Sequence, residues 1–246
     1  MTISGVLVLA AGKSSRIAEV AGGAPKPLLP IAGKPVLGRN LEWLAEEGVT
    51  SVWINLHHRA DAIREAIGDG RRFNVAVRYS EEPQILGTAG AWKRLEQHWS
   101  GTSLVVYGDN LLRFDLTRFQ AAHRASGLLG TLALFDPARH LNTGIAGGHV
   151  ELDGPRVRRF VEGPRPSQGG PHYVNAGVYL LEPQMRAAVG PGFQDFGRDV
   201  FPALVATGQL AGYVLEPEGY CLGIDTPASL ATARELVEHS RVDFTS

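Results

Sequence analysis

Residues 7–16 read LVLAAGKSSR, an apolar run that ends in a small, cationic turn containing a glycine. The continuous apolar run 6–11 is typical of a strand buried on both faces of a sheet. Gly12, followed by Lys13 and Arg16 directly after such a strand, is typical of a turn that receives a phosphate group. The stretch therefore predicts a sheet with a phosphate site at the end of its first strand.

Two common phosphate motifs do not fit this turn. A Walker A loop requires a glycine five residues before Gly12, where Leu7 stands. A dinucleotide-binding fingerprint fits poorly, because Ser14 and Ser15 stand where close approach of the backbone favours glycine. An ordinary strand-to-helix turn with solvated Lys13 and Arg16 therefore stays open on this stretch alone.

Apolar strand patterns alternate with helical patterns through the first 135 residues. Further strands are predicted at 51–56, 75–79, 104–107 and 128–135. Helices are predicted from Pro35 to just before Gly48, at 60–67, at 89–97 and from the cap Asp115 to Gly127. This alternation predicts an α/β fold, with a Rossmann-like, mixed but mainly parallel central sheet flanked by helices. Since ligands of such sheets lie beyond the carboxyl ends of the strands, the Gly12 turn, the Gly87 turn and Asp109 are expected to converge.

The pattern changes after residue 140, where glycine and proline become dense. A hairpin is predicted at 149–152 and 156–161, a strand at 174–181, and a C-terminal helix that starts at Thr226 and Pro227. We expect a single domain over 1–246, in which 1–135 form a first half that carries the phosphate site and 136–246 add a second half and the last helix.

Composition limits the partners that we expect. The 246 residues are 44% hydrophobic with a net charge of −1, which gives no reason to expect a nucleic-acid partner. The single cysteine, Cys221, forms no internal disulfide and fits a reducing compartment. No run approaches the ~20 apolar residues of a membrane span. We therefore expect a cytoplasmic protein without a membrane partner; a monomer and a homodimer both stay open.

The segment 24–35, APKPLLPIAGKP, follows the phosphate-type turn. Its four prolines restrict the backbone, so Lys26 loses less entropy than a free lysine when it is ordered on a ligand. A rigid surface loop with solvated Lys26 and Lys34 is the simpler interpretation of this segment taken alone.

Taken together, the two segments resemble the opening signature of the sugar-1-phosphate nucleotidylyltransferases, also called nucleoside-diphosphate-sugar pyrophosphorylases. The matching residues are Leu9-Ala10-Ala11-Gly12-Lys13-Ser14-Ser15-Arg16-Ile17, Lys26-Pro27-Leu28-Leu29-Pro30-Ile31 and Lys34-Pro35. The resemblance continues at 86–91 (LGTAGA), 107–109 (YGD), 160–164 (FVEGP), 174–179 (VNAGVY) and 223–227 (GIDTP). Mannose- and heptose-1-phosphate guanylyltransferases and muramate-phosphate uridylyltransferases look most similar.

The resemblance implies a nucleotidyltransferase domain of the nucleotide-diphospho-sugar transferase fold, with 1–135 as its nucleotide-binding half and 136–246 as its sugar-binding half and C-terminal helix. It also implies a reaction between an NTP and a sugar 1-phosphate that releases pyrophosphate. Arg16 and Lys26 are the implied catalytic residues, with Arg16 on the triphosphate and Lys26 on the charge that grows around the α-phosphate. The implied nucleotide contacts are Leu9, Ala10, Ala11, Gly12, Lys13, Ser14, Glu82, Gly87 and Thr88, of which the last three are expected to lie against the base. The implied sugar-phosphate contacts are Gly144, Glu162, Arg165 and Asn175. The implied cofactor is Mg²⁺, held by Asp109 and Asp225, because hard cations prefer carboxylate oxygens.

Two departures from the family pattern bear on activity. Gly163 stands where the family has a lysine on the sugar phosphate, and Arg165 is the nearest cation after it. The acid of the family's final D-I-G-T-P lies two places later, at Asp225, so it either reaches the metal or only caps the last helix. A catalytically silent nucleotide-sugar sensor therefore stays open as an alternative, as does a cytidylyl- or uridylyltransferase of the same fold that uses another phosphate acceptor.

Overall fold

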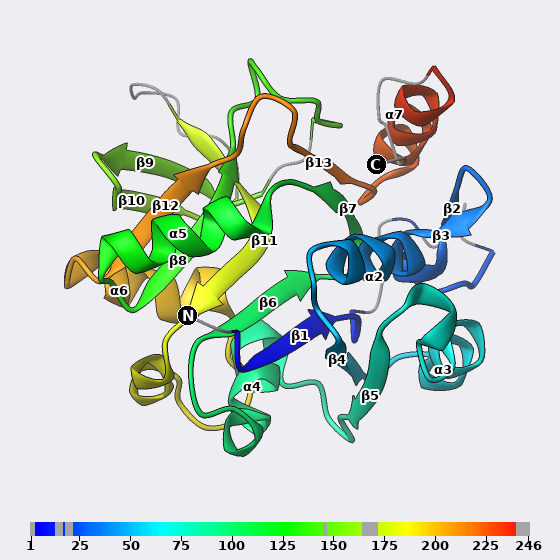
Figure 1. The fold of residues 1–246 in the computed structure, drawn as a ribbon, viewed down its shortest axis with the longest axis horizontal. Coiled ribbons are helices and arrows are strands. Elements are labelled where there is room, and N and C mark those ends of the chain that lie inside the picture. Colours follow the sequence, from blue (N-terminus) through cyan, green and yellow to red (C-terminus); the bar gives the residue numbers. More distant parts are fainter. Residues whose placement is uncertain (1–2, 13–16, 18–21, 145–146, 164–171, 240–246) are drawn as a thin grey trace.

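The computed structural model describes residues 3–12, 17, 22–144, 147–163 and 172–239 (Figure 1). Its main sheet contains β1 (Gly5–Leu9), β4 (Ser51–Leu56), β5 (Ala76–Glu81), β6 (Ser103–Tyr107), β8 (Gly130–Phe135), β9 (His149–Asp153), β10 (Arg156–Val161), β11 (Tyr173–Leu181) and β12 (Leu210–Val214). These nine strands lie in the order β5-β4-β1-β6-β11-β8-β12-β10-β9.

Parallel pairing dominates the first part of this sheet. β1 pairs in parallel with β4 and β6, and β4 pairs in parallel with β5. β11 is antiparallel to both of its main neighbours, β6 and β8, and β12 is parallel to β8. The predicted mixed, mainly parallel α/β sheet is confirmed. Its parallel strands β1, β4, β5 and β6 end at one edge, which brings their following loops together.

Helices cover both faces of the sheet. They are α2 (Val36–Glu46), α3 (Ala60–Ile67), α4 (Gly87–Arg94), α5 (Leu116–Ser126) and α6 (Phe201–Ala206). The last helix, α7 (Pro227–Glu238), instead packs in a separate apolar cluster with Ile31 and Leu222. Two small antiparallel pairs lie outside the main sheet: β2 (Pro30–Ile31) with β3 (Lys34–Pro35), and β7 (Asn110–Arg113) with β13 (Tyr220–Gly223). β7 starts directly after Asp109, and β13 ends shortly before Asp225. The pairing of these two strands therefore brings Asp109 and Asp225 to the same region.

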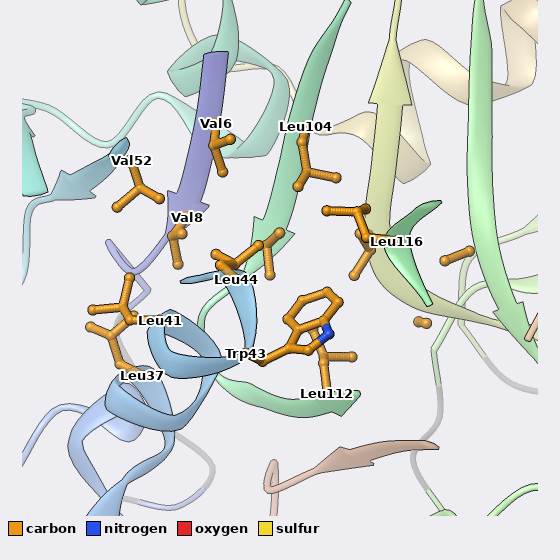
Figure 2. Close-up of a cluster of buried hydrophobic side chains, with 14 of the residues drawn as sticks. Val6, Val8, Leu37, Leu41, Trp43, Leu44, Val52, Leu104, Leu112 and Leu116 are labelled. Atoms are coloured by element: carbon orange, nitrogen blue, oxygen red, sulfur yellow. The ribbon is translucent and has the colours of Figure 1, made fainter. Parts of the chain in front are cut away.

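The core follows from the side-chain alternation of the strands. Val6 and Val8 of β1 face one layer with Leu37 and Leu41 of α2 (Figure 2). Leu7 faces the other layer, where Trp92 of α4 packs. Because both faces are covered, the central strands are continuously apolar. Each fully buried side chain of this size contributes about 1.5–3 kcal/mol.

Most predicted elements agree with the structure. The strand at 51–56, the helix at 60–67 and the hairpin strands around Gly154 are present, and Asp115 caps α5 by accepting from the N–H of Arg118 at 2.8 Å. The helix predicted at 89–97 instead ends at Arg94, followed by a 3₁₀ turn, Glu96–His98. The sequence did not predict β2, β3, β7, β12 or β13, because each is defined by its partners rather than by its own pattern, and all but β12 have four residues or fewer.

Candidate active site

The turn after β1 is held by the neighbouring strand. The N–H of Ala10 donates to Asn55 Oδ1, at the end of β4, at 2.8 Å. Leu9, Ala11 and Gly12 line a cavity of about 230 Å³ beyond this strand end. Lys13, Ser14 and Arg16, expected to cradle and contact the triphosphate, lie outside the described residues, so their roles stay predictions.

Glu82, expected to contact the base, lies against the same cavity but already has protein partners. Its Oε1 accepts from Asn55 Nδ2 at 2.8 Å, and its Oε2 accepts from the N–H of Leu86 at 2.9 Å. The residue is only 2% exposed. The carboxylate therefore shapes the loop 82–87, and its contact with a base stays a prediction that would use its remaining lone pairs.

Gly87 starts α4 with a φ of 73°, a conformation that favours glycine. A Cβ there would lie 2.4 Å from the carbonyl oxygen of Gln194. That same oxygen accepts from the N–H of Ala89 at 2.9 Å. The glycine thus allows close approach of another backbone segment, which sequence reasoning did not identify; its expected contact with a base stays a prediction.

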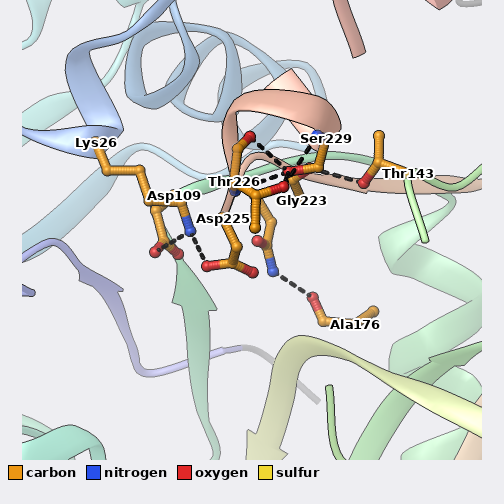
Figure 3. A network of polar contacts seen from close by, with 9 residues as sticks. Lys26, Asp109, Thr143, Ala176, Gly223, Asp225, Thr226 and Ser229 are labelled. Atoms are coloured by element: carbon orange, nitrogen blue, oxygen red, sulfur yellow. Dashed lines mark hydrogen bonds and ion pairs between the residues drawn. The ribbon is translucent and has the colours of Figure 1, made fainter. Parts of the chain in front are cut away.

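Three charged side chains meet beyond the ends of β6 and β13 (Figure 3). Lys26 Nζ lies 2.8 Å from Asp109 Oδ2 and 2.6 Å from Asp225 Oδ1. Burial alone would lower the pKa of Lys26, but the two carboxylates outweigh it and raise the pKa. The structure thus brings together a predicted catalytic cation and both predicted metal ligands, from positions up to 199 residues apart.

Asp225 is not the cap of the last helix. Thr226 is the N-cap of α7: its hydroxyl accepts from the N–H of Ser229, and the Ser229 hydroxyl accepts from the N–H of Thr226. The Asp225 carboxylate points instead toward Lys26 (Figure 3). The structure therefore excludes the capping role that the sequence left open for Asp225, and its role as a metal ligand stays a prediction.

A second cavity of about 210 Å³ adjoins the first. Thr88, Tyr107, Asp109 and Asp195 line both, and Lys26, Glu162, Asn175 and Asp225 line the second. Gly147 and Gly148 line it too, whereas Gly144, a predicted sugar-phosphate contact, is not among its lining residues. Arg165 lies outside the described residues. Asp109, which contacts Lys26, therefore lies where the two cavities meet.

Hydrogen bonds fix the polar residues of this second cavity. Asn175 Oδ1 accepts from the N–H of Gly177 at 3.0 Å, and Asn175 Nδ2 donates to the Tyr179 hydroxyl at 2.7 Å. The Thr88 hydroxyl donates to Asp195 Oδ2 at 3.0 Å and accepts from the N–H of Phe196 at 2.9 Å. Thr88, expected near the base, thus ties α4 to the segment that carries Asp195.

Sequence reasoning missed Asp195. This residue caps the π-helical turn Phe196–Val200, accepting from the N–H groups of Gly197 and Arg198. An acid before an apolar segment is a helix-start signal, but nothing local places it in a cavity. Desolvation and the neighbouring Asp195 carboxylate raise the pKa of Glu162, and Arg198 opposes them. The cavity is therefore acidic where it meets Glu162 and Asp195.

These features belong to a known family. Residues 5–240 match the nucleotidyl transferase family, so the chain belongs to it. The resemblance to this family that the sequence predicted is confirmed. In the part of the chain that the structure describes, no helix is long and apolar enough to cross a membrane.

Among individual relatives, the chain is 32% identical to UTP–glucose-1-phosphate uridylyltransferase of Synechocystis over 215 residues, 82% of this chain and 55% of the relative. It is 28% identical to mannose-1-phosphate guanyltransferase of Schizosaccharomyces pombe, over 92% of this chain and 62% of the relative. The chain thus spans little more than half the length of these curated relatives. The crystal structure of HddC from Yersinia pseudotuberculosis superposes with a TM-score of 0.79 at 25% identity, over 96% of this chain and all of HddC.

Proposed function

We propose that this chain transfers a nucleoside monophosphate from an NTP to a sugar 1-phosphate and releases pyrophosphate. The observation that carries the proposal is the position of Lys26 Nζ, within hydrogen-bonding distance of Asp225, which lines the second cavity, and of Asp109, which lines both cavities. Residues up to 135 supply most of the first cavity, which we assign to the nucleotide. Glu162 and Asn175 from the second half line the cavity that we assign to the sugar.

The reaction needs placement and positive charge rather than an enzyme nucleophile. A phosphate oxygen of the sugar 1-phosphate attacks the α-phosphorus in line, and pyrophosphate leaves. The Lys26 ammonium lies next to this junction, where it would neutralise the charge that develops on the α-phosphate. We assign Arg16, as a planar donor, to the triphosphate and Arg165 to the sugar phosphate.

Asp109 and Asp225 fit a divalent cation, because one ammonium already lies within hydrogen-bonding distance of both carboxylates. Within the described residues no group of three or more His, Cys, Asp or Glu side chains could hold a metal. A Mg²⁺ ion there would take its remaining ligands from phosphate oxygens and water. When bound, it would supply positive charge to the phosphates, and Lys26 would have to give up part of its contact with the two carboxylates.

We propose GTP and a hexose or heptose 1-phosphate as the substrates. HddC has been solved complexed with GMP-PN, at 26% identity to this chain and a TM-score of 0.78, and mannose-1-phosphate guanyltransferases recur among the relatives. Glu82 lines the nucleotide-side cavity, and the lone pairs that remain beyond its bonds to Asn55 and Leu86 suit the two adjacent donors of a guanine edge. The uridylyltransferase relative makes UTP the competing nucleotide.

One matrix of assays tests these assignments. The protein is incubated with Mg²⁺, each NTP in turn and a panel of sugar 1-phosphates, and pyrophosphate release is measured. Turnover is expected with GTP and a hexose or heptose 1-phosphate. Turnover confined to UTP would overturn the nucleotide assignment, and binding of NTP without turnover for any pair would favour the nucleotide-sugar sensor.

A further inference from the structure

Phe193 is the large apolar side chain that stands out on the described surface. It is 56% exposed, and no other large apolar residue in the described part of the chain is exposed. It lines the nucleotide-side cavity with Leu9, Ala11 and Ile85. An aromatic ring left in water at the mouth of an apolar cavity gains free energy when a flat apolar partner covers it.

The backbone around Phe193 is fixed by its neighbour, Gln194. The N–H of Gln194 donates to the carbonyl of Leu86 at 2.8 Å, and the Gln194 carbonyl accepts from Ala89 and Gly90 at 2.9 and 3.2 Å. The Gln194 side chain donates to the carbonyl of Phe193 at 3.1 Å and accepts from the N–H of Gly190 at 3.3 Å. Phe193 is thus attached to the same α4 end that bounds the nucleotide cavity.

We propose that the Phe193 ring stacks on the base of the bound NTP and forms one wall of the nucleotide site. The proposal rests on the proposed function, because it takes an NTP as the occupant of this cavity. A stacked ring recognises any base, since every base has a π-face. Phe193 would therefore set affinity for all NTPs alike, whereas an edge acceptor such as Glu82 would set the preference among them.

The test compares the wild type with Phe193→Ala, Phe193→Leu and Phe193→Tyr. The dissociation constants for GTP, UTP and inorganic tripolyphosphate are measured by calorimetry. Alanine substitution is expected to weaken binding of both nucleotides roughly 5- to 100-fold. Binding of tripolyphosphate, which carries the phosphates without a base, should not change. Tyrosine should retain the affinity, and leucine should lose most of it, because leucine keeps apolar area but not the aromatic face.

Several outcomes would overturn the stacking. Equal loss of tripolyphosphate binding would mean that Phe193→Ala disturbs the phosphate site, and full affinity in Phe193→Leu would mean that only apolar cover matters. A change of sedimentation coefficient in Phe193→Ala, with unchanged nucleotide binding, would assign the ring to an interface between copies. The melting temperature should stay constant, because the ring is exposed. A wild type that neither binds nor turns over any NTP would refute the proposed function itself, whereas an active wild type with an equally active Phe193→Ala would refute only the stacking.

Discussion

Removal of the Lys26 ammonium is expected to weaken both the fold and the reaction, by amounts that the geometry allows us to work out. Loss of one partner of a buried ion pair typically costs about 3–5 kcal/mol. Lys26 is 4% exposed, but its partners Asp109 and Asp225 keep 33% and 20% of their side chains in water, which recovers part of the loss. We therefore expect Lys26→Ala to lose about 2–3 kcal/mol without metal, a fall in melting temperature of roughly 5–10 °C for a chain of this size.

Mg²⁺ should reverse much of this loss, because the variant removes the ammonium that the Asp109 and Asp225 carboxylates share. The assay is thermal unfolding at neutral pH across a Mg²⁺ titration. Mg²⁺ should stabilise Lys26→Ala more strongly and at lower concentration than the wild type, in which the ammonium competes for the same oxygens. Turnover should still fall by on the order of 10²–10³, because magnesium does not replace the charge at the α-phosphate.

The neighbouring Lys34 provides a matched control. Its ammonium pairs with Glu42 at 2.7 Å, but the Lys34 side chain is 53% exposed, against 5% for Lys26. Lys34→Ala should therefore cost under about 1 kcal/mol and leave the Mg²⁺ response unchanged. Because the pKa of Lys26 is raised in the folded protein, its ion pairs stabilise the fold fully at any pH below the ordinary lysine pKa. This stabilisation is lost only as pH rises through the higher folded pKa. The deficit of Lys26→Ala should thus be constant from about pH 6 to 9. Equal melting temperatures for Lys26→Ala and Lys34→Ala, with equal responses to Mg²⁺, would refute this reasoning.

Three further comparisons separate roles within the site. Asp225→Asn should lower turnover about 100-fold and shift the Mg²⁺ dependence of the rate to higher concentrations. As the control, Thr226→Ala should cost about 1 kcal/mol of stability through the lost cap and leave the Mg²⁺ dependence unchanged. Matching Mg²⁺ curves for Asp225→Asn and the wild type would leave Asp109 as the sole carboxylate ligand. Gly87→Ala should lose about 2–4 kcal/mol of unfolding free energy in denaturant, since its Cβ would lie 2.4 Å from the Gln194 carbonyl oxygen at a positive φ. As the control, Gly12→Ala should unfold like the wild type, because its Cβ would have nothing within 4 Å. Equal stability of the two variants would contradict the close backbone contact. Because the pKa of Glu162 is raised, its contribution to stability is present below the ordinary glutamate pKa and is lost as pH rises through the folded value. Glu162→Gln should therefore be more stable than the wild type at pH 7 and match it at about pH 4. A wild-type advantage at pH 7 would show that the carboxylate is stabilised in the folded state.

Local signals in the sequence predicted the elements that carry the site. The apolar run before Gly12 and the strand at 51–56 are defined by their own residues, because both faces of a central strand are buried. The order of strands and helices then placed Asp109 and the Gly87 turn at one edge of the sheet. Lys26 was identified by its prolines and by family resemblance.

Contacts between distant segments could not be read from these patterns. The bond from Lys26 to Asp225 joins residues 199 positions apart and depends on the pairing of β7 with β13, two short strands without a clear pattern. Asp195 lies in the cavity because the backbone of Gln194 packs against the start of α4. This contact is made by main-chain atoms and requires a glycine at position 87. The sequence also led to Gly87 being assigned to a base contact, whereas packing of the chain against itself already requires a glycine there.

The stoichiometry of turnover is the decisive measurement. Purified protein is incubated with Mg²⁺, GTP and mannose or heptose 1-phosphate, and pyrophosphate, NDP-sugar and free phosphate are quantified together, with reactions lacking each substrate as controls. We predict one pyrophosphate per NDP-sugar, no product without the sugar 1-phosphate, and loss of both products in Asp109→Ala. Formation of neither product with any NTP and any sugar 1-phosphate, or release of pyrophosphate that does not need the sugar 1-phosphate, would contradict the proposed function.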